Sequence, residues 1–314
     1  MALINKSILK KRIQQVYEKS VQKGLAFKSV QQTVSLSTLN LHANYLARLI
    51  TKTIEQERFR PSYLHPKKIQ TRNKERVVFP LTPIDNIVQG VLFEILLQHA
   101  LPKISQHVHS YIPGRGTQTA IYEFVSYIKK FNLTHPKDDI YILRTDINKF
   151  TDSIPLNKNS KVWKQLDSLI ASMEFDEHAK PYLTQLIHAY IQPFIQTKYK
   201  STYQSIVGLP MGTPLSSIVA NLYLADLDRA IESLSDILYL RYGDDLLIAH
   251  HDPNIIVQAE KIYEEYLVRL ELSRNRSKDL KLYFTRSGRS HFDPDWKGTD
   301  TIDYIGFSVN RLGN

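Results

Sequence analysis

Residues 240–248, LRYGDDLLI, place two adjacent aspartates between two short apolar runs that favour strands. Adjacent carboxylates repel each other and are depleted within strands, so they must lie where water or a cation can reach them. Gly243, directly before them, is a turn signal. The segment therefore predicts a tight hairpin with Asp244 and Asp245 at its tip, where they either stay in water as ordinary turn residues or bind a cation.

The composition indicates which partners to expect. The 314-residue chain is long enough for one large domain or two closely packed ones. Its 41 Lys and Arg exceed its 31 Asp and Glu, and the net charge of +10 favours a polyanion such as nucleic acid, nucleotides or an acidic membrane surface. The chain has no cysteine, which excludes disulfides and thiolate metal sites. With no apolar stretch near the roughly 20 residues of a spanning helix and no signal-peptide core, we expect a cytoplasmic protein without a membrane partner.

Two kinds of periodicity alternate along the chain. Apolar spacing predicts helices within residues 1–60, 84–101, 208–234 and 254–272. A strongly β-prone run at 141–147 and the segment around the paired aspartates predict strands. This alternation predicts an α+β fold, with the helices on one side of a small sheet.

A second source of carboxylate is Asp146, in RTDINKF, which closes the strand predicted at 141–147. Alone, an aspartate at a strand end is usually turn chemistry or a helix cap. Together with Asp244 from the hairpin, it can converge on a pair of Mg²⁺ ions, which prefer a few carboxylates plus water and substrate phosphate oxygens. The carbonyl of Ile147 could complete the ligand set. Two such ions stabilise the attacking and leaving oxygens of an in-line phosphoryl transfer.

Three segments, TDINKFTDSIP, GLPMGTPLSSIVANLYL and RYGDDLLI, resemble in order and spacing the palm motifs A, B and C of reverse transcriptases. KERVVFPLTPIDNIVQGVLFEIL and SYIPGRGTQTAIYEF resemble fingers blocks of group II intron, retron and related bacterial enzymes, and LELSRNRSK and DYIGFSVN resemble motifs D and E. The resemblance implies a right-hand polymerase fold with an antiparallel palm sheet. It also implies a helical extension at residues 1–60, fingers at 61–135, and a palm at 136–310 with a fingers insertion at about 156–200.

The resemblance also assigns roles to single residues. Asp146, Asp244 and Asp245 correspond to the acids that hold two Mg²⁺ ions, with Mn²⁺ as the alternative ion and the Ile147 carbonyl as a further ligand. Lys278, in LELSRNRSK, resembles the lysine proposed to protonate the departing pyrophosphate, although an exposed lysine without a role fits the same pattern.

Other residues of the resemblance concern substrate binding. A guanidinium can bind phosphate oxygens in two places, which suits the fingers residue that holds a triphosphate. The residues so assigned to the nucleotide are Arg76, with Arg72 and Lys74 as its partners. Those assigned to nucleic acid are Arg115, Gly208 and Tyr242, and Gly212 lets the backbone approach a base pair. A solvated charged loop, loop glycines and a packed hairpin aromatic are the structural alternatives.

Three departures from the family pattern affect nucleotide positioning. Thr151 stands where the family usually has Phe or Tyr to exclude a 2′-hydroxyl, unless Phe150 fills that space. Met211 replaces the glutamine of motif B that contacts the nucleotide, and it cannot donate that hydrogen bond. Ser216 and Ser217 replace the Ser-Pro pair that usually follows. These departures resemble the divergent bacterial lineages linked to phage defence and abortive infection.

The chain ends soon after the motif E match, so we expect no complete thumb. A homo-oligomer, a partner protein or a structured RNA would then supply the grip on the duplex. The sequence thus predicts an RNA-dependent DNA polymerase that uses dNTPs and a noncoding RNA template, releases a DNA product and serves antiphage defence. The alternatives are template-independent or protein-primed DNA synthesis, an RNA-dependent RNA polymerase, and a non-catalytic RNA-binding scaffold.

Overall fold

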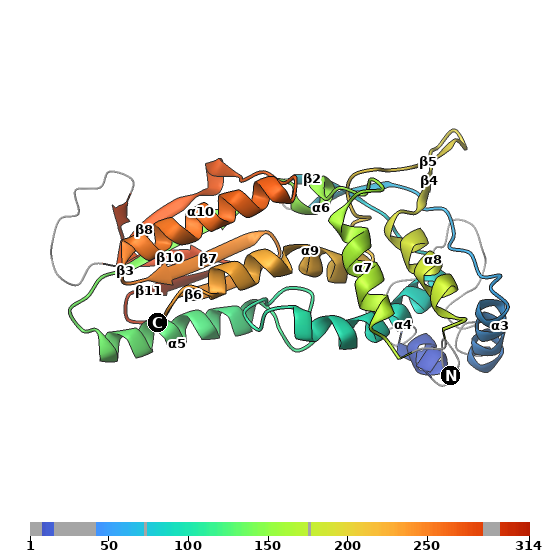
Figure 1. Ribbon diagram of the computed structural model, residues 1–314, viewed down its shortest axis with the longest axis horizontal. Coiled ribbons are helices and arrows are strands. Elements are labelled where there is room, and N and C mark those ends of the chain that lie inside the picture. Colours follow the sequence, from blue (N-terminus) through green and yellow to red (C-terminus); the bar gives the residue numbers. More distant parts are fainter. Residues whose placement is uncertain (1–7, 16–41, 72–73, 175–176, 285–295) are drawn as a thin grey trace. The chain divides into compact units, whose positions relative to one another are not determined.

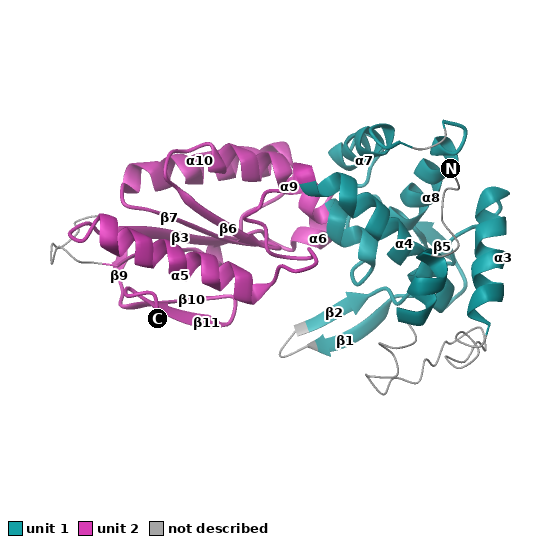
Figure 2. Cartoon of the chain, turned by 90° about the horizontal axis from the view of Figure 1, so that it is seen from below, with its two compact units in different colours: residues 1–101, 155–219 teal, residues 102–154, 220–314 magenta. Residues whose placement is uncertain are grey.

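The computed structural model describes residues 8–15, 42–71, 74–174, 177–284 and 296–314 (Figure 1). These residues form two compact units (Figure 2). Unit 1 comprises residues 1–101 and 155–219, and unit 2 comprises residues 102–154 and 220–314. No helix of the described segments is long and apolar enough to cross a membrane.

Unit 2 is built on a five-stranded sheet with the order β6-β7-β3-β8-β9. Its strands are β3 (Ile140–Asp146), β6 (Leu238–Tyr242), β7 (Asp245–His250), β8 (Leu280–Phe284) and β9 (Lys297–Gly298). Every pairing is antiparallel except that of β8 with the short β9. The central position of β3 explains why it is buried almost throughout, since both of its faces are covered.

The hairpin predicted around the paired aspartates is confirmed. Tyr242 pairs with Asp245, so Gly243 and Asp244 form a two-residue connection between β6 and β7. Gly243 has a φ of 69°, which a side chain would strain, and glycine is the preferred first central residue of a II′ hairpin turn. Asp244 therefore lies in the turn, and Asp245 is the first residue of β7.

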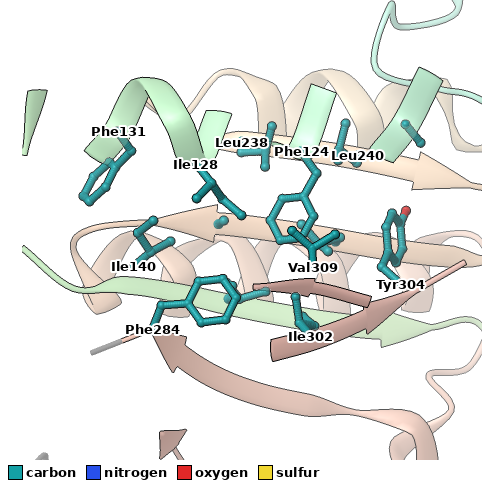
Figure 3. Close-up of a cluster of buried hydrophobic side chains, with 14 residues drawn as sticks. Phe124, Ile128, Phe131, Ile140, Leu238, Leu240, Phe284, Ile302, Tyr304 and Val309 are labelled. Carbon is teal, nitrogen blue, oxygen red and sulfur yellow. The ribbon is translucent and has the colours of Figure 1, made fainter. Parts of the chain in front are cut away.

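Helices cover both faces of the sheet in unit 2, so the prediction of helices on one side was wrong. α5 (Thr117–Thr134) and the small sheet of β10 (Thr301–Tyr304) and β11 (Phe307–Asn310) pack on one face, where Phe124, Ile128 and Leu240 meet in a closed core (Figure 3). α10 (Pro253–Arg269) contacts β3 and β7 on the other face (Figure 1). Burial along β3 is nearly continuous, as expected of a strand covered on both faces rather than on one.

Unit 1 contains helices and two small hairpins. The helices are α3 (Ala43–Glu55), α4 (Pro83–Ala100), α7 (Lys161–Ala171) and α8 (Lys180–Ile191), and residues 8–15 are also helical. The hairpins pair β1 (Lys67–Thr71) with β2 (Lys74–Val78), and β4 (Phe194–Gln196) with β5 (Thr202–Gln204). Thr82 caps α4 by accepting a hydrogen bond from the Asp85 N–H at 3.1 Å, and Tyr190 of α8 donates to the buried Asp85 carboxylate at 2.9 Å.

The two units divide the chain differently from the domain ranges expected above. Residues 102–135, expected in the fingers, belong to unit 2 with the five-stranded sheet. Residues 201–219, expected in the palm, belong to unit 1. The helix α9 (Pro214–Glu232) contains the division between the units.

Candidate active site

The pairing of β3 with β7 brings the predicted acids to one end of the sheet. Asp146, the last residue of β3, is the register partner of Asp245, the first residue of β7. The N–H of Ile147 then donates to the carbonyl of Asp244 at 3.1 Å, which ties the end of β3 to the hairpin turn. Residues almost one hundred positions apart in the sequence thus meet at one sheet edge, as the hairpin hypothesis required.

The Asp146 carboxylate is buried and accepts two hydrogen bonds from one short segment. Lys278 Nζ lies 2.6 Å from Asp146 Oδ2, and Asn275 Nδ2 lies 3.0 Å from Oδ1. The segment reaches Asp146 because its backbone continues the ladder, with Asn275 N–H donating to the Asp146 carbonyl at 2.8 Å. Lys278, in the 3-10 turn η2 (Arg276–Lys278), is therefore placed at the acids, as the motif D resemblance implied.

Asp244 has a different environment from Asp146. Burial raises the pKa of the Asp244 carboxyl above its ordinary value, and the neighbouring Asp146 carboxylate raises it further. The Lys278 ammonium acts in the opposite direction on that pKa but does not cancel the rise. A carboxylate whose ionisation is disfavoured by a second carboxylate is a group that a divalent cation would stabilise.

Asp245 is held by a cation of its own. Arg144 of β3 binds it in a bidentate pair, with Nε 3.1 Å from Oδ1 and Nη2 3.1 Å from Oδ2. Arg144 also donates to the Asp303 carbonyl at 2.8 Å, which links this pair to β10. In this structure both Asp245 oxygens are engaged with Arg144 rather than with the Asp146–Asp244 pair, although Asp245 had been predicted as a metal ligand.

The donor set fits a magnesium site of modest protein coordination. Within the described residues, no group of three or more His, Asp or Glu side chains is arranged to hold a metal ion. Two carboxylates, Asp146 and Asp244, converge instead. The backbone bonds flanking Ile147 use the Asp146 carbonyl and the Asn148 N–H, which leaves the Ile147 carbonyl outside that ladder. Mg²⁺ commonly takes one or two carboxylates and completes its shell with water and substrate phosphates.

A buried ion pair lies directly beneath the hairpin turn. Arg241 of β6 and Asp228 of α9 are both fully buried, with Arg241 Nε and Nη2 each 2.7 Å from a carboxylate oxygen. Tyr239 donates to the same carboxylate at 2.6 Å. Arg241 Nη1 donates to the Gly243 carbonyl at 3.1 Å, which fixes one side of the turn. Breaking such a pair by removing one partner leaves a buried charge unpaired, at a cost of about 3–5 kcal/mol.

Ser110 fixes the other side of the turn. Its hydroxyl accepts the Gly243 N–H at 2.8 Å, and its carbonyl accepts a hydrogen bond from Asn221 Nδ2 at 2.9 Å. Asn221 Oδ1 accepts from Arg241 Nη1 at 3.2 Å, so the three side chains and Gly243 form a closed ring. We call Ser110, Asn221, Asp228 and Arg241 the turn clamp. Because all four are buried, the clamp holds the backbone that precedes Asp244 in one position.

The segment that carries Ser110 is itself braced. Its backbone runs beside β6, with the Arg241 N–H donating to the His107 carbonyl at 3.0 Å and the His109 N–H donating to the Arg241 carbonyl at 2.9 Å. Glu123 of α5 bonds both histidines, and these bonds lower the pKa of Glu123 to about 2 against its burial. Arg115 Nη1 donates to the carbonyls of Ser105 and Val108, each at 2.9 Å. This geometry favours a bracing role for Arg115 over the predicted nucleic-acid contact.

Two of the three predicted phosphate-binding residues, Lys74 and Arg76, belong to β2 in the β1–β2 hairpin of unit 1. Arg76 is exposed and pairs in register with Ile69, and Lys74 pairs with Thr71. By strand alternation Arg76 and Lys67 belong to one face of the hairpin. On the other face Lys68 is neutralised by Glu75 at 2.8 Å. The hairpin therefore keeps the Arg76 face basic. Arg72 lies outside the described residues.

The motif B loop is attached to the same hairpin. The Met211 carbonyl accepts the Phe79 N–H at 3.1 Å, immediately after β2. Gly208 and Gly212 have φ of 86° and 92°, so both glycines are required by the backbone conformation alone. Ser216 donates to the Pro210 carbonyl at 2.9 Å and closes the loop onto α9. Unit 1 thus holds the nucleotide candidates Arg76 and Met211 on one connected piece of chain.

Two further predicted residues lie close to the acids in sequence. Phe150 is buried, whereas Thr151 beside it in α6 (Phe150–Ser153) is half-exposed. The side chain nearer to solvent in this pair is therefore that of Thr151 rather than the Phe150 ring. Tyr242 is half-buried at the end of β6, next to the turn.

Comparison with known proteins decides the family. A family model described as reverse transcriptase (RNA-dependent DNA polymerase) matches residues 65–309. The chain belongs to the reverse transcriptase family. Among curated proteins it is 31% identical over 158 residues to an uncharacterized 91 kDa protein in the cob intron of Schizosaccharomyces pombe. That match covers 49% of this chain and 17% of the relative.

Solved structures agree with the family assignment. The telomerase of Candida albicans, in complex with the TWJ fragment of telomeric RNA, aligns with a TM-score of 0.62 at 14% identity, over 89% of this chain and 50% of that one. The apo telomerase of Candida tropicalis, truncated from its C-terminal domain, aligns with a TM-score of 0.60 at 12% identity, over 81% and 54%. The chain spans about half the length of these structures. At such identity they show the fold, a right-hand polymerase fold with palm and fingers.

The sequence predicted the three acids but not the residues of the turn clamp. Sequence reasoning missed the clamp residues Ser110, Asn221, Asp228 and Arg241. The available signal was Arg241 itself, because a guanidinium inside a strand of apolar residues must have a buried partner. Arg144, one residue from the end of a similar apolar run, carried the same signal for the Asp245 pair.

Replacing each of the two adjacent aspartates by asparagine should change Tm in opposite directions. Because the pKa of Asp244 is raised in the folded state, its ionised form lowers the free energy of unfolding at neutral pH. Asp244→Asn should therefore raise Tm at pH 7, on the order of 1–2 °C. The gain should vanish below about pH 4, where the carboxyl is protonated in both states. Asp245→Asn, which breaks the Arg144 pair, should lower Tm at pH 7. Equal losses for both variants by scanning calorimetry would contradict this account.

Ser110→Ala tests the turn clamp. Removing the hydroxyl leaves the buried Gly243 N–H without its acceptor, at a cost of about 1–3 kcal/mol of stability. Ser160→Ala is the matched control, since Ser160 is also buried and accepts a backbone N–H, that of Val162 at 3.1 Å, but in unit 1. We expect both variants to lose stability by denaturant unfolding, and only Ser110→Ala to lower kcat in primer extension, about 10- to 100-fold, with KM little changed. Equal kcat losses would reduce the clamp to a structural role.

Proposed function

We propose that this chain is an RNA-dependent DNA polymerase that extends a primer by two-metal nucleotidyl transfer. The observation that carries the proposal is the meeting of Asp146 and Asp244 at one end of the β3–β7 pairing, in a chain of the reverse transcriptase family. The net charge of +10 suits a nucleic-acid template and product. The telomerase that aligns with this chain was solved with an RNA fragment, which supports RNA as the template class.

The residues of the chain would divide the work as follows. Asp146, Asp244 and the Ile147 carbonyl would hold the divalent ions, which polarise the α-phosphate and the primer hydroxyl when bound. Asp245, held by Arg144, would keep the start of β7 in place beside them. The ammonium of Lys278 lies at the same end of the sheet and could give a proton to the departing pyrophosphate.

We assign binding of the nucleotide's triphosphate and base to residues of unit 1. The exposed guanidinium of Arg76, on the unneutralised face of the β1–β2 hairpin, would bind the triphosphate, with Lys74 and Arg72 as partners. Met211 packs without donating a hydrogen bond, so the site would position the base by contact rather than by an amide. Tyr242 would contact the primer terminus, and the backbone at Gly208 and Gly212 would approach a base pair.

An RNA polymerase activity is the second candidate, and one observation favours it. Thr151 is half-exposed while Phe150 is buried, so no aromatic ring of this segment excludes a 2′-hydroxyl. If the enzyme nevertheless prefers dNTPs, the discrimination must come from elsewhere in the site. Parallel assays with dNTPs and rNTPs decide between the two.

A more specific biological role is part of the same proposal. The departures at Thr151, Met211 and Ser217 support a place among divergent bacterial enzymes of antiphage defence, working in the cytoplasm with a noncoding RNA. A second copy of the chain or a partner protein would help to hold the duplex. Sequencing the nucleic acid that copurifies with the protein from its native operon tests this role, since it would identify both the RNA and any DNA joined to it.

Asp244→Ala tests the activity itself. On an RNA template with a DNA primer, dNTPs and Mg²⁺, the wild-type protein should extend the primer and the variant should lose at least about 10³-fold in rate. Glu55→Ala, which removes an exposed carboxylate of α3 remote in sequence from the motifs, is the control and should keep full activity. Extension by Asp244→Ala at the control rate would refute the two-metal proposal.

Thr151→Phe tests the origin of sugar selection. A ring at this half-exposed position should exclude the 2′-hydroxyl and lower rNTP incorporation relative to dNTP incorporation by about 10- to 100-fold. Single-nucleotide insertion kinetics with dNTP and rNTP measure the ratio of kcat/KM. An unchanged ratio would show that residue 151 does not face the sugar.

A further inference from the structure

The second hairpin of unit 1 exposes aromatic rings that the proposed chemistry does not use. Phe194, Tyr199 and Tyr63 are 50%, 79% and 51% exposed. Tyr63 and Phe194 meet edge to face, with ring centroids 6.2 Å apart. Tyr63 and Phe194 thus form a contiguous exposed apolar patch, the kind of surface feature that can mark an interaction site.

The rings stand on a rigid support. The chain at Leu64 joins the edge of the β4–β5 hairpin, with Leu64 N–H donating to the Phe194 carbonyl and Gln196 N–H donating to the Leu64 carbonyl, each at 2.9 Å. Ile195 beneath them is buried. Two flat rings held by backbone bonds lose little conformational entropy on binding, which suits a stacking platform.

The two chain segments that carry the rings are basic in sequence. Residues 58–74 and 192–211 contain eight Lys and Arg and no Asp or Glu. At the tip of the hairpin, Lys198 and Lys200 are exposed, and Lys198 lies over the Tyr199 ring at 4.8 Å. Figure 1 shows this hairpin projecting beyond α8. Aromatic rings interleaved with cations match a ligand that has flat apolar faces and a polyanionic backbone.

We propose that this surface, made of Tyr63, Phe194, Lys198, Tyr199 and Lys200, binds single-stranded nucleic acid by stacking bases on its rings. A single strand fits better than a duplex, because only unpaired bases offer their faces for stacking. The lysines contact the phosphates and carry no sequence information. The proposal goes beyond the synthesis proposed above, because binding here needs neither the acids nor a divalent ion.

The hairpin offers its own matched control. Tyr203 is 49% exposed, nearly the same as Phe194, but it pairs with Ile195 and so belongs to the opposite face of the hairpin. Tyr122 of α5, 75% exposed in unit 2, is the remote control. Removing either ring takes away a similar apolar surface without touching the platform.

The test is fluorescence anisotropy with a labelled 20-nucleotide oligo(U), in EDTA. Phe194→Ala and Tyr63→Ala should each raise Kd about tenfold, and Phe194→Trp should restore binding. Tyr203→Ala and Tyr122→Ala should stay within about twofold of wild type. The double variant Lys198→Gln, Lys200→Gln should lower the slope of log K against log salt by about 1.4. Thermal melting checks that each variant is folded.

Three outcomes overturn the proposal. The first is unchanged binding by folded Phe194→Ala and Tyr63→Ala variants, and the second is an equal loss in Tyr203→Ala. The third is a dimer in sedimentation velocity that these variants abolish without changing oligo(U) binding, which would make the surface an interface between copies. Asp244→Ala separates this proposal from the previous one, because that variant should bind oligo(U) like wild type whether or not the chain polymerises.

Discussion

The register of β3 against β7 is the constraint on which the site depends. By placing Asp146 opposite Asp245, it sets three carboxylates at one end of a sheet, where their mutual repulsion must be offset. The fold supplies Lys278, from η2 beside β3, to Asp146, and Arg144, from β3 itself, to Asp245. Asp244 makes no ion pair with the described residues, and burial together with the neighbouring Asp146 carboxylate raises its pKa. The structure therefore concentrates its electrostatic cost on the one residue at the tip of the turn.

The interior of unit 2 is organised to hold that tip still. A fully buried ion pair is rarely the most stable way to fill a core, since apolar residues of similar volume often do as well. Arg241 and Asp228 instead offer fixed donors and acceptors, which with Ser110 hold both backbone groups of Gly243. Holding the turn in place to within a fraction of an ångström matters for phosphoryl transfer, because the chain contributes mainly orientation and charge to that reaction. We interpret the Arg241–Asp228 pair as a means of fixing the position of the turn rather than of stabilising the core.

Sequence reasoning reached the features that are encoded locally. The turn at Gly243, the strand that ends at Asp146 and the fit to the reverse transcriptase family all follow from short segments read in order. It failed where a partner lies far along the chain, since the clamp joins Ser110 to Gly243 across more than one hundred residues. It also assigned Arg115 to nucleic acid, whereas this side chain donates to the carbonyls of Ser105 and Val108. It also placed the helices on one face, although the unbroken apolar run at 140–143 is the pattern of a strand covered on both faces.

The central claim is that Asp146 and Asp244 bind one divalent centre together. Electron paramagnetic resonance of Mn²⁺, titrated into the protein with primer–template and a nonhydrolysable dNTP analogue, tests it most directly. The account predicts that Asp146→Asn and Asp244→Asn each weaken the same tight site and that the double variant is little worse than either single one. Tight Mn²⁺ binding that survives both substitutions, or losses that simply add, would contradict it.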